Sequence, residues 1–281
     1  MKVACTGRSR ALGTRIAEIL GAGVVGSWTT RFPDGELYLQ TGSLDDTTVV
    51  VGSLLSDESL VELLLLIDAC QRSEVLLVVP YLGYARQDRE FIPGEPVSAR
   101  AIARALSTGV SRVVTVNVHK ESVLSHFTVP ASQVTLEAEI GDFIATLGLE
   151  DPLILAPDEG AASFAAAVAA RGGWATDHLE KTRISGEEVR MEPVRGDPWT
   201  GDVVLVDDII STGGTLAAAA RMLAARGAKG VHAVCVHGLF AGKARTLLGS
   251  AGIRELASSD TIESENSRYT AAAAIARALS R

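Results

Sequence analysis

The segment from residue 203 to residue 215 brings together side chains that suit a phosphorylated sugar. A valine-rich strand pattern at 203–206 ends in two adjacent carboxylates, and a loop with hydroxyl groups and two glycines leads into a helical pattern. The residues that could contact a ligand are Asp207, Asp208, Ser211, Thr212, Gly213, Gly214 and Thr215. Glycines let backbone N–H groups approach a ligand closely, and a helix N-terminus favours an anion. The carboxylates can accept hydrogen bonds from sugar hydroxyls.

An ordinary capped helix after a strand would explain part of this pattern, with Ser211 or Thr215 as the N-cap residue. Capping requires neither two acids at the end of the strand nor two consecutive glycines. We therefore favour a loop that holds a sugar phosphate.

Five further segments combine charged, aromatic and turn-forming residues. They are Arg31-Phe32-Pro33-Asp34-Gly35-Glu36, the segment 80–89 with Arg86, Gln87 and Asp88, His119 after a strand, Asp158-Glu159-Gly160-Ala161 before a helix, and Glu180-Lys181-Thr182-Arg183. By itself, the segment 31–36 predicts a Pro-Gly turn between strands. His119 is explained equally well as a helix-capping or core histidine.

A Gly-rich segment at 21–26 satisfies the spacing G-x-G-x-x-G of dinucleotide-binding proteins. That fingerprint requires a strand, a loop and a helix in this order. Here the segment follows a helical pattern at 12–20, so we interpret it as a helix that ends at Gly21. The chain has no G-x-x-x-x-G-K-[ST] loop either.

The elements that must position these residues alternate between strands and helices. Short apolar runs predict strands at 49–52, 75–80, 113–118, 153–156, 203–206 and 231–236, and helical patterns lie at 59–70, 98–106, 161–170 and 215–225. Strands that are apolar on both faces and alternate with helices are typical of parallel sheets covered by helices. The strand–helix–strand spacing at 49–80 recurs at 203–236, which suggests two related domains that meet near residues 139–141. The charged segment 177–198 is predicted to be a hairpin or flap outside the core, with a solvated surface loop as the alternative.

Composition narrows the class of protein. The 281 residues are 47% hydrophobic and carry a formal net charge of -8. So acidic a chain is a poor candidate for binding nucleic acid or anionic membranes, since both require basic surface. The most apolar run, 60–67, is far shorter than the ~20 residues of a membrane span. Three scattered cysteines without metal-ligand spacing and the lack of a signal-peptide pattern lead us to expect a cytoplasmic protein.

The loop at 207–215 resembles the phosphoribosyl pyrophosphate loop of the type I phosphoribosyltransferase fold. Together with the five other segments, in this order and over nearly the whole chain, it resembles the ribose-phosphate diphosphokinase family. The length of the chain and the Lys-Thr-Arg segment are most similar to the archaeal branch. The resemblance implies an α/β protein of two related type I phosphoribosyltransferase-like domains, each a mainly parallel sheet flanked by helices. We expect the domains at 1–140, completed by a C-terminal helix at 265–281, and at 141–264.

The resemblance also implies an activity and its residues. The family transfers the β,γ-diphosphoryl group of ATP to the C1 hydroxyl of ribose 5-phosphate. ATP would be bound by Phe32, Asp34, Gly35, Glu36, Arg86, Gln87, Asp88 and His119, and ribose 5-phosphate by Arg183 and the loop Asp207, Asp208, Ser211, Thr212, Gly213, Gly214 and Thr215. Asp158, Glu159, Gly160 and Ala161 would form the pyrophosphate loop, and Lys181 and Arg183 would be the catalytic residues of the flap. Mg²⁺ would be held by His119 and Asp158, and the Phe32 loop would serve a neighbouring subunit, so that at least a dimer forms.

Two residues depart from the family pattern. Asn117 stands where many members have Asp, and Ser211 stands where bacterial and animal members usually have Asp. Two other functions remain open from the sequence: a regulatory relative that binds phosphoribosyl compounds without catalysis, and a purine or pyrimidine phosphoribosyltransferase. The intact Lys181 and His119 disfavour the first, and the Arg86-Gln87 segment disfavours the second.

Overall fold

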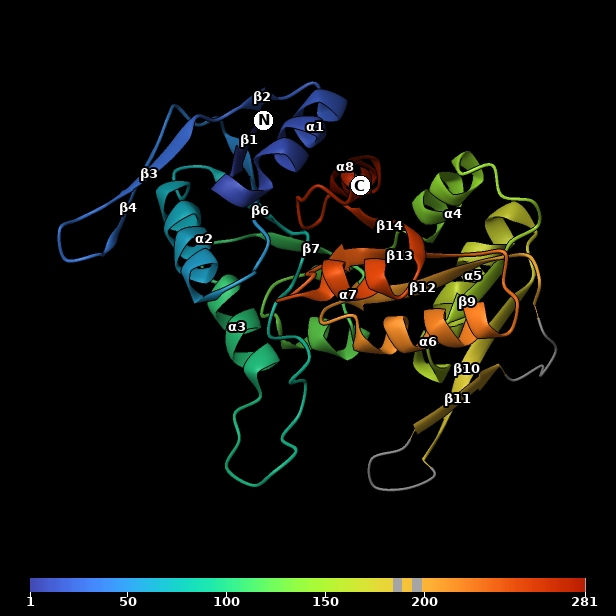
Figure 1. The fold of residues 1–281 in the computed structure, drawn as a ribbon. Coiled ribbons are helices and arrows are strands. Elements are labelled where there is room, and N and C mark those ends of the chain that lie inside the picture. Colours follow the sequence, from blue (N-terminus) through green and yellow to red (C-terminus); the bar gives the residue numbers. More distant parts are fainter. Residues whose placement is uncertain (184–188, 194–198, 281) are drawn as a thin grey trace. The chain divides into compact units, whose positions relative to one another are not determined.

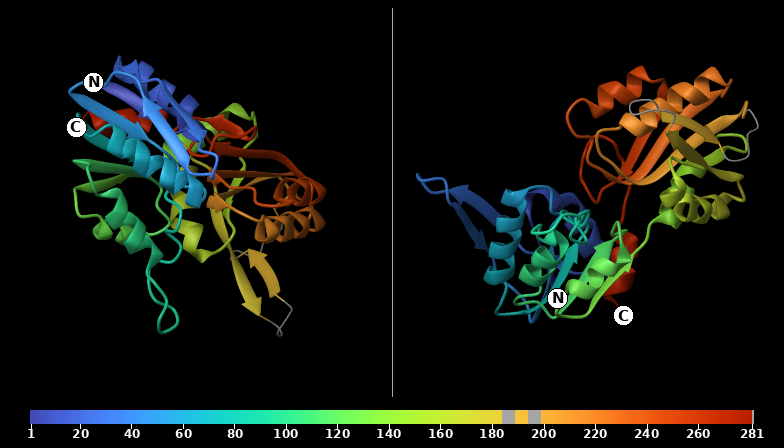
Figure 2. Two further views of the ribbon diagram at one scale, coloured as in Figure 1. Left: turned by 90° about the vertical axis from the view of Figure 1, so that its left-hand side faces the viewer. Right: turned by 90° about the horizontal axis from the view of Figure 1, so that it is seen from below.

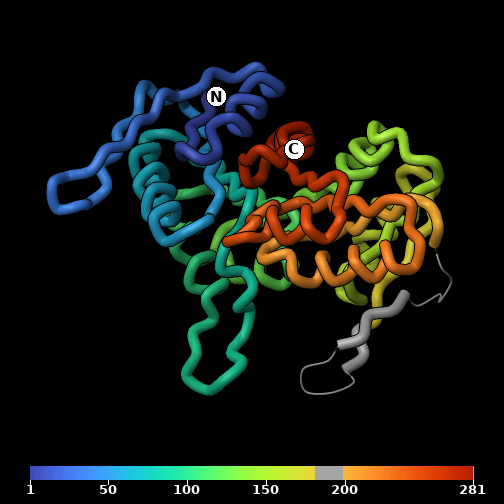
Figure 3. Tube along the Cα trace, in the orientation of Figure 1, coloured from blue at the N-terminus to red at the C-terminus, as the bar shows by residue number. Residues whose placement is uncertain are grey.

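The computed structural model describes residues 1–183, 189–193 and 199–280, with the backbone alone for 181–183 and 189–193, and forms two compact units (Figure 1). Unit 1 comprises residues 1–135, 261–263 and 270–281, and unit 2 comprises residues 136–260 and 264–269. The two chain ends therefore both belong to unit 1 (Figure 3). Residues 136–140 and 265–269 group with unit 2, whereas the division made from the sequence assigned them to the N-terminal domain, and residues 261–263 group with unit 1, whereas that division assigned them to the C-terminal domain.

Unit 1 is built on a six-stranded sheet in the order β2-β1-β5-β6-β7-β8, in which every neighbouring pair is parallel. Its strands are β1 (Lys2–Cys5), β2 (Gly23–Val24), β5 (Thr47–Val51), β6 (Glu74–Val79), β7 (Arg112–Val116) and β8 (Ala131–Val134). The inner strands β5, β6 and β7 are mostly apolar and almost entirely buried, as expected for strands that are covered on both faces. The helices of this unit are α1 (Arg10–Leu20), α2 (Asp57–Ala69), α3 (Ser98–Leu106) and α8 (Ala272–Leu279), with 3-10 turns η1 (Gly7–Ser9) and η2 (Glu121–His126).

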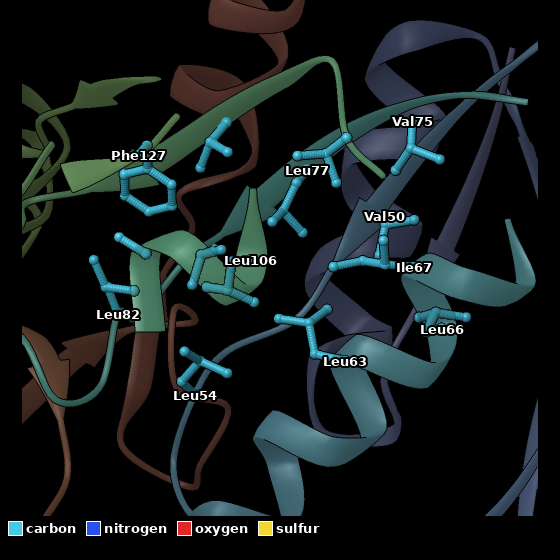
Figure 4. Close-up of a cluster of buried hydrophobic side chains, with 14 of the residues drawn as sticks. Val50, Leu54, Leu63, Leu66, Ile67, Val75, Leu77, Leu82, Leu106 and Phe127 are labelled. Carbon is cyan, nitrogen blue, oxygen red and sulfur yellow. The ribbon is translucent and has the colours of Figure 1, made fainter. Parts of the chain in front are cut away.

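The core of unit 1 forms where α2 and α3 pack on this sheet. Leu63 and Ile67 of α2 face Val50 and Leu77 of the strands, and Leu106 of α3 lies in the same cluster (Figure 4). Burial of such side chains contributes about 1.5–3 kcal/mol each, which explains why the apolar run at 60–67 forms a packed helix.

Helix α1 ends at the first glycine of the Gly-rich segment. Gly21 is its C-cap residue, with a left-handed φ of 61°, and its N–H donates to the carbonyls of Ala17 and Glu18. The segment therefore closes a helix instead of opening one, which confirms that it is no dinucleotide fingerprint.

A two-stranded antiparallel hairpin, β3 (Ser27–Arg31) and β4 (Leu37–Thr41), projects from unit 1 (Figure 1). Every residue of β3 after Ser27 is exposed. The predicted Pro-Gly turn at 32–36 joins the two strands.

Unit 2 contains a seven-stranded sheet in the order β11-β10-β9-β12-β13-β14-β15, parallel except for the pair β10–β11. The strands are β9 (Leu153–Ala156), β10 (Thr176–Arg183), β11 (Val189–Pro193), β12 (Asp202–Ile210), β13 (Gly230–Gly238), β14 (Ile253–Ser259) and β15 (Ser267–Tyr269). The helices are α4 (Glu137–Thr146), α5 (Ala162–Gly172), α6 (Gly214–Ala225) and α7 (Ala244–Ser250), with the 3-10 turn η3 (Glu159–Ala161). The predicted fold of mainly parallel sheets flanked by helices is confirmed in both units.

Candidate ribose-phosphate site

Asp207 and Asp208 lie within strand β12 and not after it, which corrects the boundary expected from the sequence. The strand continues to Ile210 because Ile209 and Ile210 pair with His237 and Gly238 of β13. The hydroxyl- and glycine-containing loop therefore begins only at Ser211.

The two carboxylates are packed closely. The N–H of Asp208 donates to Oδ1 of Asp207 at 2.9 Å. Burial raises the pKa of Asp207 to about 8, and the negative charges of Asp208 and, to a smaller extent, Asp158 act in the same direction. A cation or a set of hydroxyl donors placed beside this pair would relieve that repulsion.

The first turn of helix α6 is open to solvent. Thr212, Gly214 and Thr215 are exposed, and among the described residues no side chain caps the helix. Neither Ser211 nor Thr215 is the N-cap residue, because Gly213 occupies that position. The simple capped helix considered from the sequence is therefore wrong.

Helix α2 of unit 1 follows its own strand and provides a contrast. There Ser56 is the N-cap residue, and a capping box with Ser59 satisfies the first N–H groups. The N-terminus of α6 lacks such a box, so its N–H groups remain available to an anion.

The structure explains the two glycines of the loop in different ways. Gly213 has a left-handed φ of 74°, and a Cβ there would meet the side chain of Leu248 at 3.0–3.2 Å. A Cβ at Gly214 would meet nothing within 4 Å. The protein itself thus requires Gly213, whereas the free space at Gly214 leaves room for a ligand.

The predicted pyrophosphate loop, Asp158 to Ala161, follows strand β9, and β9 pairs directly with β12. Asp158 is the N-cap residue of η3, while Glu159 and Gly160 are exposed. The influence of Asp158 on the pKa of Asp207 indicates that the two loops adjoin at the carboxyl ends of neighbouring strands. The structure therefore brings these two predicted segments together.

The residues predicted to bind ATP belong to unit 1. In the turn of the β3–β4 hairpin, Phe32, Asp34, Gly35 and Glu36 are all exposed. The N–H of Phe32 donates to the carbonyl of Glu36 at 2.9 Å, and the N–H of Gly35 donates to the carbonyl of Phe32 at 2.9 Å. The Phe32 ring stands edge-on to Tyr38, with centroids 5.6 Å apart. The turn is thus closed by its own backbone, and the Phe32 ring is half exposed.

Arg86, Gln87 and Asp88 lie in the long loop between β6 and α3. Arg86 is exposed, and the carbonyl of Gln87 accepts from the N–H of Ala99 at 3.2 Å. Asp88 Oδ2 accepts from Nζ of Lys120 at 2.9 Å, and this contact lowers the pKa of Asp88. Its other oxygen, Oδ1, is buried and has no partner among the described residues.

Lys120 was not identified from the sequence, although it directly follows His119. His119 itself is exposed. The preceding Asn117 is buried and has a φ of 36°, a conformation that asparagine tolerates better than most residues. In the sequence, an asparagine two residues before His119, at the end of a strand pattern, was the signal for this corner of the site.

The predicted flap begins inside the sheet. Residues Thr176 to His178 of β10 pair with β9, and residues Leu179 to Arg183 then pair antiparallel with β11 (Figure 2). Lys181 is opposite Met191, and Arg183 is opposite Val189. The side chains of Lys181 and Arg183 and residues 184–188 and 194–198 lie outside the described residues. The predicted hairpin is confirmed for its paired backbone.

The predicted metal ligands lie in different units, His119 in unit 1 and Asp158 in unit 2. Within the described parts of the chain, no group of three or more His, Cys, Asp or Glu side chains is arranged to hold a metal ion. The donor chemistry of Asp158, Asp207 and Asp208 nevertheless suits a hard cation, which prefers oxygen ligands.

The three cysteines, Cys5, Cys70 and Cys235, are buried free thiols. Burial raises the pKa of Cys5 to about 12 and that of Cys70 to about 11. In the part of the chain that the structure describes, no helix is long and apolar enough to cross a membrane.

The parallel sheet, the open helix N-terminus and the paired carboxylates define a protein of the phosphoribosyltransferase type. Residues 132–269 match the family model of the phosphoribosyl transferase domain, and residues 1–109 match the N-terminal domain of ribose phosphate pyrophosphokinase.

Individual relatives of the same family match this chain over nearly its whole length. The ribose-phosphate pyrophosphokinase of Methanosarcina acetivorans is 44% identical and aligns over 100% of both chains. That of Methanopyrus kandleri is 41% identical over 99% of this chain and 98% of its own. The crystal structure of phosphoribosylpyrophosphate synthetase from Mycobacterium smegmatis superposes with a TM-score of 0.85 at 26% identity, covering 99% of this chain and 97% of the other. The chain therefore belongs to the ribose-phosphate pyrophosphokinase family, as its motifs indicated.

Proposed function

We propose that this chain is an active ribose-phosphate diphosphokinase, which transfers the diphosphoryl group of ATP to C1 of ribose 5-phosphate. The products are 5-phosphoribosyl 1-diphosphate, a precursor for nucleotide biosynthesis, and AMP. Family membership over the full length supports the activity. The observation that carries the assignment of the site is the uncapped N-terminus of α6 beside Asp207 and Asp208.

Ribose 5-phosphate is assigned to this end of β12. The phosphate would accept hydrogen bonds from the N–H groups and hydroxyls of 211–215, where Thr212, Gly214 and Thr215 are exposed. The carboxylates of Asp207 and Asp208 would accept hydrogen bonds from ribose hydroxyls. Asp207 must lose its proton to accept fully, so sugar binding and deprotonation are coupled at this residue.

ATP is assigned to unit 1. The exposed ring of Phe32 can stack on adenine, and the carboxylates of Asp34 and Glu36 can accept from the amino edge of the base. The unpartnered Oδ1 of Asp88 supports a polar ligand at the loop 86–88, because a buried oxygen without a hydrogen bond is costly.

Lys181 and Arg183 are assigned to the transfer itself. Diphosphoryl transfer is mainly a matter of positioning and of neutralising phosphate charge. An arginine offers a planar fork of donors, which suits the ribose 5-phosphate and diphosphoryl oxygens, and a lysine offers a point charge. Placement on a hairpin at the edge of the sheet would let both residues approach with substrate and exclude water.

Mg²⁺ is the proposed cofactor, and His119 and Asp158 are the residues proposed to hold it. When bound, Mg²⁺ neutralises charge on the phosphate oxygens. Few protein ligands are needed, since Mg²⁺ usually keeps several waters. The carboxylate of Asp158 is the stronger candidate, because an imidazole is an unusual ligand for so hard an ion.

Self-association is proposed through the β3–β4 hairpin. Trp28, Phe32 and Tyr38 on this hairpin are 50%, 49% and 39% exposed. Such aromatic side chains on a projecting hairpin suit a protein interface. We assign the Phe32 turn to the ATP site of a neighbouring subunit in at least a dimer. The buried thiols fit the cytoplasm, where we place the reaction.

The test is an assay of AMP formation with ATP, Mg²⁺ and ribose 5-phosphate. We expect AMP in equal amount to 5-phosphoribosyl 1-diphosphate, and none without ribose 5-phosphate. Nucleotide donors other than ATP, tested in parallel, define the donor range. A folded oligomer that binds ribose 5-phosphate in calorimetry but forms no AMP would identify a regulatory relative instead. Release of pyrophosphate that depends on an added purine or pyrimidine base would identify a phosphoribosyltransferase.

Dilution tests the shared ATP site. If Phe32 serves a neighbour, specific activity falls as the protein is diluted below the dimer dissociation constant. Full activity in a demonstrated monomer excludes this arrangement.

A further inference from the structure

A short segment after β13 holds the start of the ribose-phosphate loop. The N–H groups of Leu239 and Phe240 donate to the carbonyl of Ile210 at 3.0 and 3.1 Å, and the N–H of Ala241 donates to the carbonyl of Ser211 at 3.0 Å. Ile210 is the last residue of β12, and Ser211 is the first residue of the loop. Three consecutive donors therefore fix the point at which the backbone leaves the sheet.

Phe240 lies in the middle of this segment with a φ of 44°. This left-handed conformation is unfavourable for a residue with a bulky side chain, and it persists only where the surroundings impose it. Strained residues of this kind gather at functional sites, where the strain serves to preorganise a ligand-binding geometry.

The ring of Phe240 explains how the conformation is maintained. The residue is 3% exposed. The guanidinium carbon of Arg245 lies 4.9 Å from the ring centroid, and Arg245 also donates to the side chain of Asn266 at 2.7 Å. A Cβ at Gly238 would come within 2.4 Å of the ring, so the glycine is required for the ring to occupy this place. The aromatic side chain thus packs between β13 and α7.

The same region supports the far end of the loop. Helix α7 places the fully buried Leu248 where a Cβ at Gly213 would meet it at 3.0–3.2 Å. We call residues 239–248 the buttress segment. It contacts the loop at Ile210 and Ser211 through hydrogen bonds and at Gly213 through packing.

We infer that Phe240 is a positioning residue for ribose 5-phosphate binding. Its left-handed backbone aims the three N–H groups at the loop, and its buried ring prevents the segment from relaxing. The open N–H groups of the α6 N-terminus are thereby held in one arrangement before the phosphate arrives, which lowers the entropic cost of binding. Phe240 acts through the loop and contacts no substrate. The inference rests on the proposed function of that loop.

The test compares Phe240→Ala with Phe143→Ala. Phe143 is an aromatic residue of the same unit that stacks on Tyr269 with centroids 5.7 Å apart, so its replacement controls for lost aromatic packing. Calorimetry with ribose 5-phosphate alone should show a dissociation constant at least about tenfold higher for Phe240→Ala, equivalent to about 1.4 kcal/mol. Phe143→Ala should lower the melting temperature and leave that constant unchanged. In steady-state kinetics, Phe240→Ala should raise the KM for ribose 5-phosphate more than it lowers kcat. Hydrogen exchange at the amides of Leu239 to Ala241 should accelerate in Phe240→Ala only.

Unchanged affinity in folded Phe240→Ala would overturn the inference, and so would equal losses of affinity in both variants. If Phe240→Ala does not fold, the Phe240→Leu variant tests the inference instead, since it keeps an apolar side chain but loses the flat ring. Its affinity for ribose 5-phosphate is expected to fall at least about threefold. Failure of the proposed function is a separate outcome, in which the wild-type protein forms no AMP. The exchange of the amides from 239 to 241 still reports on the buttress segment in that case.

Discussion

Replacing Asp207 with asparagine should stabilise unit 2, by a margin that grows with pH. Burial, and then the charges of Asp208 and Asp158, raise the pKa of Asp207 from 3.8 to about 8. Between these values the folded chain keeps a proton that the unfolded chain has released. Because the folded state binds more protons, the stability of the wild-type protein falls as pH rises through this window. The amide side chain of the Asp207→Asn variant has no proton to lose, so the variant escapes this loss.

The size of the effect follows from the width of the window. One pKa unit corresponds to about 1.36 kcal/mol. Between pH 5 and pH 7 the wild-type protein should therefore lose up to about 2.7 kcal/mol relative to Asp207→Asn, and less if Asp208 takes up part of the proton. At pH 4 the two proteins should be nearly equal in stability.

Urea unfolding at pH 4, 5, 6 and 7 measures this difference. Trp28 is the single tryptophan of unit 1, so a Trp28→Phe background leaves Trp174 and Trp199 to report on unit 2. Asp142→Asn is the matched control, because Asp142 pairs with Arg171 on the surface, where ion pairs contribute little. Parallel stability curves for Asp207→Asn and the wild type would refute a protonated Asp207 in the folded protein.

Three further predictions concern the loop, its counterpart in unit 1 and the flap. Gly213→Ala should destabilise the protein by about 1–3 kcal/mol because of the left-handed φ at this position and the contact with Leu248. Gly214→Ala should leave the stability unchanged or slightly raised and should weaken ribose 5-phosphate binding. Unfolding curves measure the first effect, and calorimetry with ribose 5-phosphate measures the second. Ser56→Ala should cost about 1 kcal/mol in unfolding experiments without changing ribose 5-phosphate affinity, and a change of affinity would contradict the contrast between the two helix ends. Lys181→Ala should reduce turnover strongly in the AMP assay while ribose 5-phosphate affinity stays nearly constant, and the reverse pattern would exclude the assigned role.

The sequence by itself determined the fold class, the family and most of the regular elements. Strand 153–156 and helix 98–106 were predicted to the residue, because a short apolar run or an alanine-rich run with a clear period and polar ends leaves few alternatives. The end of α1 at Gly21 also followed from local chemistry, since glycine is the residue that adopts the left-handed cap without strain.

Only the tertiary structure decided how the candidate site is built. Strand β12 includes Asp207 and Asp208 because β13 offers pairing partners as far as Gly238, and no local pattern reveals the length of a neighbouring strand. The same applies to Lys120 beside Asp88 and to Leu248 beneath Gly213, which meet across long stretches of chain. Phe240 belongs to this second group as well. No pattern in the sequence distinguishes this phenylalanine, and its positioning role follows from a backbone conformation that the surrounding packing imposes.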